Sequence, residues 1–199
     1  MNIIEKIMKK YIDQTTEYIE GVIVQRIVDS HEYAMRKVHS DWNAIYKQAV
    51  SQFYSYVTTR YYRHVTGKGT GTGVNLYKSN LTEIVSSPSY FNDVPSSSIN
   101  YKIAADNMDD YWKPRREESG YGNVLPASYV LDVILAGTRG IPGHYGMPYA
   151  EFINVRDSIG NTYSGVTLGE LFDQFINNEE DIYHYYLFKR FNDVKHLKL

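Results

Sequence analysis

Residues 35–57, MRKVHSDWNAIYKQAVSQFYSYV, form the stretch of sequence that decides the fold. Large apolar residues recur in it at intervals of three or four, at Met35, Val38, Trp42, Ile45, Ala49, Phe53 and Val57. Because an α-helix has about 3.6 residues per turn, this spacing places the apolar side chains along one face. The stretch therefore predicts an amphipathic helix.

Helical spacing covers residues 3–65 almost throughout, and no proline lies in this half of the sequence. An earlier apolar stripe consists of Ile4, Ile7, Met8, Tyr11, Thr15, Tyr18, Ile19, Val22 and Ile23. Asp29 and Ser30 lie between the two stripes, and either side chain can cap a helix N-terminus. The sequence predicts two long helices, or one long helix kinked near Asp29 and Ser30.

The pattern changes after residue 66. Residues 67–73 contain four glycines and predict a flexible link or loop, because glycine loses much backbone entropy in a regular element. The runs 76–86, 99–105 and 128–136 are short, favour β-structure and are separated by clusters of Pro, Ser, Asn and Asp. They predict the strands of a small antiparallel sheet.

Two loops interrupt this β-rich half. Residues 106–123 are polar, turn-rich and mixed in charge, which predicts a solvated, protruding loop. Residues 138–148 carry too many glycines and prolines for a helix or a central strand. A short hairpin is predicted after them, from residues 152–156 through a turn at 160–161 into 162–164.

The C-terminal segment has a clear helix start, because Thr167 and Glu170 have the spacing of a capping box. One face of the predicted helix carries Leu168, Leu171, Phe172, Phe175 and Ile176. Asn178 is predicted to cap a second helix, whose acidic first turn and basic last turn suit the helix dipole.

These patterns predict an α+β fold with long N-terminal helices, a small antiparallel β-sheet and C-terminal helices. The predicted organisation is a long helical region over 1–66, a β-rich region with long loops over 67–166 and a helical segment over 167–199. We expect these parts to form one compact domain with a helical arm.

Composition excludes several classes of function. The 199-residue chain has a formal net charge of -2, which argues against a protein whose affinity comes mainly from neutralising nucleic-acid phosphates. It contains no cysteine, which excludes disulfides, thiolate zinc sites and cysteine nucleophiles. Its apolar runs are too short to span a bilayer and no signal-peptide pattern opens the sequence, so we expect a soluble protein that assembles in the cytoplasm.

Tyrosine is unusually frequent, with 20 Tyr against 7 Phe and 2 Trp. Tyrosine combines a large contact area with few rotatable bonds and a polar tip, which suits surfaces that become interfaces. Codon bias in an AT-rich genome explains the same excess without any function.

No motif of a catalytic, cofactor or metal site stands out. The glycine run lacks the preceding strand and the Gly-Lys-Ser/Thr ending of a phosphate loop. The six histidines lack the spacing of metal ligands, and Asp106, Asp109 and Asp110 lack the ligand order of a calcium loop. A Gly-x-Ser-x-Gly nucleophile motif is also missing. We expect no enzyme activity, no catalytic residue, no cofactor and no metal ion.

Three short motifs follow one another between residues 72 and 152. They comprise a turn with Thr72, Gly73, Leu76 and Ser79, a run over 129–137 that ends in Gly-Thr at Thr138, and a loop with Ile141, Pro142, Pro148 and Tyr149. In this order they resemble the small tail-completion or head-tail joining proteins of long-tailed bacteriophages. The spacing departs from that family by one extra residue after Gly73 and another within 129–137, and Leu135 and Ala136 replace the family's acidic-aromatic pair.

The resemblance implies a structural virion protein of a tailed bacteriophage, a ring-forming neck component that joins head to tail. The partners it implies are copies of the same chain and portal, connector or tail proteins, with no membrane and no sequence-specific nucleic acid. In such a ring we expect contacts from the Tyr-bearing N-terminal helix and from the Gly/Pro loop over 138–148. The predicted interface residues are Tyr54, Tyr61, Tyr62, Arg139, Ile141, Pro142, His144, Tyr145, Pro148 and Tyr149.

Two other functions stay open. A nucleic-acid-binding or regulatory module could use the helical half, where Arg26, Arg36, Lys37, Lys47, Arg60 and Arg63 alternate with tyrosines. Acidic residues such as Glu17, Glu20, Glu32 and Asp41 dilute that basic set. An enzyme would need an active site assembled from residues far apart in the sequence.

Overall fold

The computed structural model describes residues 3–56, 76–87, 96–106, 111–112, 124–125, 127–137 and 153–193. In chain order these residues form α1 (Ile3–Tyr56), α3 (Leu76–Ser79), β1 (Glu83–Ser87), β2 (Ser96–Asn100), β3 (Tyr111–Trp112), β4 (Val124–Leu125), α4 (Ala127–Ala136), β5 (Asn154–Arg156), β6 (Thr162–Ser164) and α5 (Leu168–Phe191). The predicted α+β class, with a long N-terminal helix, small antiparallel strand pairs and a C-terminal helix, is confirmed.

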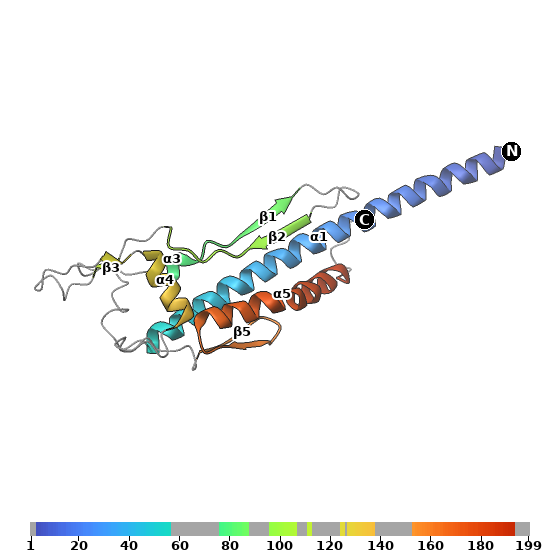
Figure 1. Cartoon of the computed structure of the whole chain (residues 1–199). Coiled ribbons are helices and arrows are strands. Elements are labelled where there is room, and N and C mark those ends of the chain that lie inside the picture. The colour runs from blue at the N-terminus through green and yellow to red at the C-terminus, as the bar shows by residue number, and fades with distance from the viewer. Residues whose placement is uncertain are drawn as a thin grey trace, which may run out of the picture.

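α1 is one continuous helix of 54 residues that runs through the body and projects far beyond it (Figure 1). Of the two predicted arrangements, two separate helices are wrong and one long helix is confirmed. Inside the helix, Asp29 accepts a hydrogen bond from the Gln25 amide at 2.8 Å, and Ser30 is buried. Because α5 packs beside α1 on the C-terminal side of this point, the packing outweighs the capping preference of the two side chains.

α5 packs along α1 in the antiparallel direction (Figure 1). The predicted capping box is confirmed, since the Thr167 hydroxyl accepts the Glu170 N–H at 3.1 Å and the Glu170 carboxylate accepts the Thr167 N–H at 3.3 Å. The predicted second helix start at Asn178 is wrong. Ile182 and Tyr186 continue the buried stripe past it, so burial against α1 keeps the backbone helical to Phe191.

Trp42 of α1 lies at the centre of the core and is fully buried. Its ring contacts those of Tyr46, Tyr101, Phe172 and Phe175, with centroids 4.8–5.8 Å away. The indole N–H donates to Asn80 Oδ1 at 2.9 Å. Since these partners belong to α1, α5 and the segments beside α3 and β2, the one side chain joins most layers of the body.

The strands form three separate antiparallel pairs, β1 with β2, β3 with β4 and β5 with β6. In the first pair Glu83 faces Asn100 and Ser87 faces Ser96. The predicted strand over 76–86 is therefore wrong in its first four residues, which form the helical turn α3. The predicted hairpin near the C-terminus is confirmed as β5 and β6, joined through Gly160 at φ +102°.

The strand predicted over residues 128–136 is wrong, because this segment is the helix α4. Ala127, Leu131 and Ile134 lie at helical spacing and are buried in the core. The helix is followed by Gly137 at φ +74°, the left-handed conformation that commonly ends a helix. The β-branched residues of this run favoured a strand, but the spacing that packs on the core is helical.

Several predicted features lie outside the described residues. These are the end of the helical pattern at 57–65, the glycine run 67–73, most of the loop 106–123 and the whole loop 138–148. The proposed domain boundaries stay a prediction.

Replacing Trp42 with Phe should lower the free energy of unfolding by about 1–3 kcal/mol, because it leaves space in the core and removes the donor to Asn80. Urea unfolding followed by circular dichroism measures this change. Lys47→Ala, at an exposed position on the same helix, is the matched control and should stay within about 0.5 kcal/mol of the parent. Equal stability of the two variants would contradict the central role of Trp42.

Candidate functional site

The N-terminal part of α1 forms an arm, defined here as residues 3–23, that projects from the body (Figure 1). Residues 3–20 are all exposed. Large apolar side chains lie bare along it, with Ile3 75% exposed, Tyr11 72% exposed and Ile19 still 49% exposed. The full apolar set, called the arm stripe, is Ile3, Ile4, Ile7, Met8, Tyr11, Ile12, Tyr18, Ile19 and Ile23.

An exposed apolar surface of this extent is unusual in a soluble protein and marks a contact surface. Successive members of the arm stripe recur at intervals of one, three or four, apart from one interval of six between Ile12 and Tyr18, and they occupy one broad face of the helix. Lysine and acidic residues occupy the other face, at Lys6, Lys9, Asp13 and Glu20. The arm therefore has the amphipathic form of a helix that packs on another helix or on an apolar surface.

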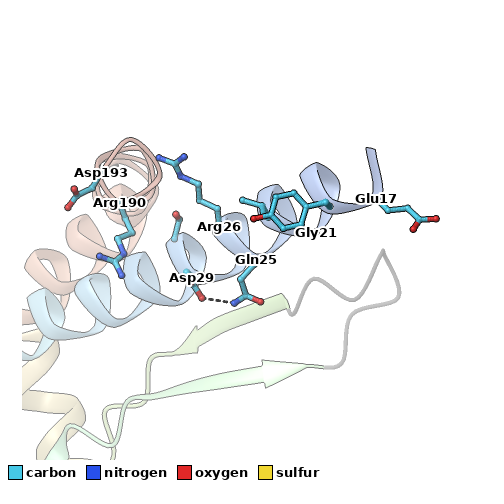
Figure 2. Close-up of a pocket in the computed structure, with 10 residues that line it drawn as sticks. Glu17, Gly21, Gln25, Arg26, Asp29, Arg190 and Asp193 are labelled. Atoms are coloured by element: carbon cyan, nitrogen blue, oxygen red, sulfur yellow. Dashed lines mark hydrogen bonds between the residues drawn. The ribbon is translucent and has the colours of Figure 1, made fainter. Parts of the chain in front are cut away.

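A groove opens where the arm meets the body, at the end of α5 (Figure 2). It has a volume of about 730 Å³ and is lined by Glu17, Tyr18, Gly21, Val22, Gln25, Arg26, Asp29, Ser30, Arg190 and Asp193. The Arg26 guanidinium lies 4.8 Å from the centroid of the Phe191 ring, and Arg190 lies 5.4 Å from that of Tyr33. With both signs of charge at its wall, the groove has no strong preference for an anion or a cation.

A second groove of about 410 Å³ lies between α1, β2 and α5. His31 Nδ1 lies 2.8 Å from the Tyr183 hydroxyl, and burial lowers the pKa of His31 against a smaller opposing effect of Glu32. Tyr101 donates a hydrogen bond to the Glu179 carboxylate, and burial raises the pKa of Tyr101. These pairs link α1 to α5 and α5 to the segment that follows β2.

Two buried carboxylates serve the β5–β6 hairpin, since Asp157 shapes its turn and Asp41 links it to α1. Asp157 Oδ1 accepts the backbone N–H groups of residues 159–161 at 2.8–3.0 Å, and its Oδ2 accepts the Tyr163 hydroxyl at 2.7 Å. Asp41 of α1 accepts the Ser158 hydroxyl at 2.5 Å. The Ser158 oxygen also lies 2.5 Å from the Tyr186 hydroxyl.

This cluster combines residue types that also occur in active sites. Asp41, Asp157 and Tyr163 are buried, and neither groove is lined by them. Ser158 is exposed, and its hydroxyl donates to the Asp41 carboxylate of α1. The cluster therefore anchors the hairpin, and burial, opposed by the bonds from Ser158, raises the pKa of Asp41.

Among the predicted interface residues, the structure describes only Tyr54. Its hydroxyl accepts the Leu76 N–H at 3.1 Å, and its ring lies 5.8 Å from that of Phe53 and 5.7 Å from that of Tyr77. Burial raises the pKa of Tyr54 to about 12. Tyr61, Tyr62, Arg139, Ile141, Pro142, His144, Tyr145, Pro148 and Tyr149 lie outside the described residues and stay predictions.

Several cations of the alternative nucleic-acid surface contact groups of their own chain. Arg26 lies over Phe191, Arg36 lies 3.6 Å from the Glu32 carboxylate, and Lys37 lies 5.5 Å from the Tyr33 ring centroid. Arg60 and Arg63 lie outside the described residues. The described cations therefore do not form a bare basic stripe of the kind that tracks phosphates.

In the described part of the chain, no group of three His, Asp or Glu side chains is placed to hold a metal ion. No helix there is long and apolar enough to cross a membrane. Sequence reasoning found the apolar residues of the arm as one helical stripe but did not determine whether other elements cover that stripe. The spacing of apolar residues is the same on a covered and on an uncovered face, so the spacing could not show that these side chains are exposed.

No family model matches the chain, and neither the curated proteins nor the solved structures contain a significant match to it.

The raised pKa of Asp41 predicts a pH-dependent effect of Asp41→Asn. The folded state keeps the Asp41 proton to a higher pH than the unfolded state, so the stability of the parent should fall as pH rises above the ordinary value of about 3.8. Asn at position 41 does not ionise, so the free energy of unfolding of the variant, relative to that of the parent, should increase from pH 4 toward neutrality. Urea unfolding across that range measures the difference, and a constant difference would contradict the assignment.

Proposed function

We propose that the protein is a structural assembly subunit that binds neighbouring subunits through its N-terminal arm. The observation that carries this proposal is the arm stripe, which leaves large apolar side chains bare over about five helical turns. Burial of such side chains is the main favourable term in most protein association. We therefore expect the arm stripe to bind its partner through buried apolar area and complementary shape.

The body supports this role by holding the arm at a defined angle. Arg26 on Phe191, His31 on Tyr183 and Tyr33 on Tyr186 link α1 to α5 over the turns nearest the arm. Because α1 continues without a break from these contacts into the arm, a force on the arm is transmitted to the body. That is the geometry of a spacer or a connector.

The narrower proposal is a ring-forming neck component of a tailed bacteriophage. Its support is the order of motifs between Thr72 and Phe152, together with the expectation of a non-catalytic, cysteine-free chain. One of those motifs, the run over 129–137, is a helix here and a strand in the family, which weakens the resemblance. The assembly role rests on the arm and does not require this motif.

Substitution of the arm stripe should remove the protein from its assembly. A chain with Ile4, Ile7, Tyr11 and Ile19 all changed to Ser should keep the body intact but fall by about tenfold or more in the large particles of the virus or cell that encodes it. Sedimentation followed by quantitative mass spectrometry measures this fraction, and near-ultraviolet circular dichroism checks the body. Imaging of the same particles by electron cryo-microscopy tests the neck position.

The matched control replaces Lys6, Lys9, Asp13 and Glu20 with Ser, which changes as many residues on the other face of the arm. This variant should remain in the particles. Equal retention of the stripe variant and the control would overturn the assembly proposal.

A further inference from the structure

The arm stripe continues a ridge of α1 that α5 covers farther along the helix. At every fourth residue this ridge carries Tyr18, Val22, Arg26, Ser30, Ala34, Val38 and Trp42. Burial along it changes steadily, from Tyr18 exposed, through Val22 and Arg26 half-buried, to complete burial from Ser30 onward. α5 ends beside Arg26, so the groove of Figure 2 marks the point beyond which α5 no longer covers this face of α1.

The arm of a second copy can pack antiparallel on the part of this face that α5 leaves uncovered. When Asp13 of one arm lies level with Asp13 of the other, most apolar positions match in pairs, and Ile12, which lies level with Gln14, is the exception. The facing pairs are Ile3 with Ile23, Ile4 with Val22, Ile7 with Ile19, Met8 with Tyr18, and Tyr11 with Thr15. The matching follows from the near symmetry of the apolar positions about Asp13, which a two-fold contact between identical helices requires.

Charge distinguishes the antiparallel arrangement from the parallel one. Lys6, Lys9 and Lys10 lie in the outer half of the arm, whereas Glu17 and Glu20 lie in the inner half. Two packed helices have axes about 8–10 Å apart, which is comparable with the Debye length in physiological salt. Antiparallel arms therefore place basic halves beside acidic halves, whereas parallel arms place the lysines of one copy beside those of the other.

The surface available is large enough for such a contact. An arm of this length spans about 30 Å, and its apolar side chains expose on the order of 1,000 Å². Covering about half of that area on each of two arms removes roughly 1,000 Å² in total from water, the lower limit for a specific interface.

The partner arm would run in the same direction as α5 and begin where α5 ends. The bodies of the two copies would then lie at opposite ends of the paired arms.

We infer that the arm pairs with the arm of a second copy in an antiparallel, two-fold symmetric contact centred on Asp13. This inference rests on the proposed assembly function and names the partner of the arm. The dimer is a rod, in which two copies of α1 that overlap only by their arms span about 130 Å, against about 80 Å for a single α1.

Disulfide trapping tests the direction of pairing, and the chain suits it because it has no cysteine of its own. The variants Ile4→Cys and Val22→Cys, mixed and oxidised, should form the mixed disulfide dimer about tenfold more than either variant forms its own dimer. Lys6→Cys mixed with Glu20→Cys is the matched control, because these positions are level in the pair but point away from it. If Ile4→Cys alone cross-links as well as the mixture, the arms are parallel and the inference is wrong.

Oligomeric state gives the second test. The full chain should be a dimer by light scattering with a maximum dimension of at least about 130 Å by X-ray scattering. Ile7→Glu with Ile19→Glu should raise the dissociation constant about 100-fold or more, because Glu at position 7 of one arm would be buried opposite Glu at position 19 of the other. Lys47→Ala, at an exposed position of α1 outside the arm, should leave the dimer unchanged.

The outcomes separate this inference from the proposed function. A full chain that stays monomeric at every concentration reached, while the stripe variant is still lost from particles, would overturn the pairing and keep the assembly role. Monomers whose arm binds anionic phospholipid vesicles would also overturn the pairing, since a lipid surface would then cover the stripe. A trapped antiparallel dimer whose stripe variant remains in particles would instead overturn the assembly role.

Discussion

The packing of Trp42 between α1 and α5 is the contact on which the other parts of the structure depend. Four aromatic rings surround the indole, and two of them, Phe172 and Phe175, belong to α5. This contact sets the register of the two helices, which in turn places Tyr183 against His31 and Phe191 against Arg26. The pair of α1 and α5 forms the long axis of the body. The β5–β6 hairpin, α4 and the β1–β2 pair pack against these two helices.

The unequal lengths of the two helices then produce the surface that we associate with function. α1 has 54 residues and α5 has 24, so α5 covers only the inner part of α1. The outer part keeps the same amphipathic pattern without a partner among the residues that the structure describes. The function that we propose for this protein therefore depends on an uncovered helix face. The buried carboxylates Asp41 and Asp157 serve the hairpin in this scheme, because each accepts hydrogen bonds from the chain itself.

Predictions from the sequence were confirmed where the local residue pattern and the tertiary packing favour the same structure. The stripe from Met35 to Phe53 is buried as predicted, and the capping box of Thr167 and Glu170 starts α5. They failed where local preference and packing disagree. Asp29, Ser30 and Asn178 are good capping residues, yet each lies inside a helix because the apolar stripe continues on both sides of it. Leu131 and Ile134 belong to a β-branched run, yet they pack on the core from a helix.

The sequence alone determined the elements with strong periodicity, the absence of cysteine chemistry and the amphipathic character of residues 3–56. Those properties depend on residue type and spacing, which can be read directly. Only the tertiary structure decided which amphipathic face is covered. Ile7 and Ile45 carry the same side chain on the same helix, but Ile45 is fully buried and Ile7 is 58% exposed. The difference is that α5 and the strand pairs reach Ile45 and end before Ile7, and the spacing of apolar residues along α1 contains no information about where its neighbours stop.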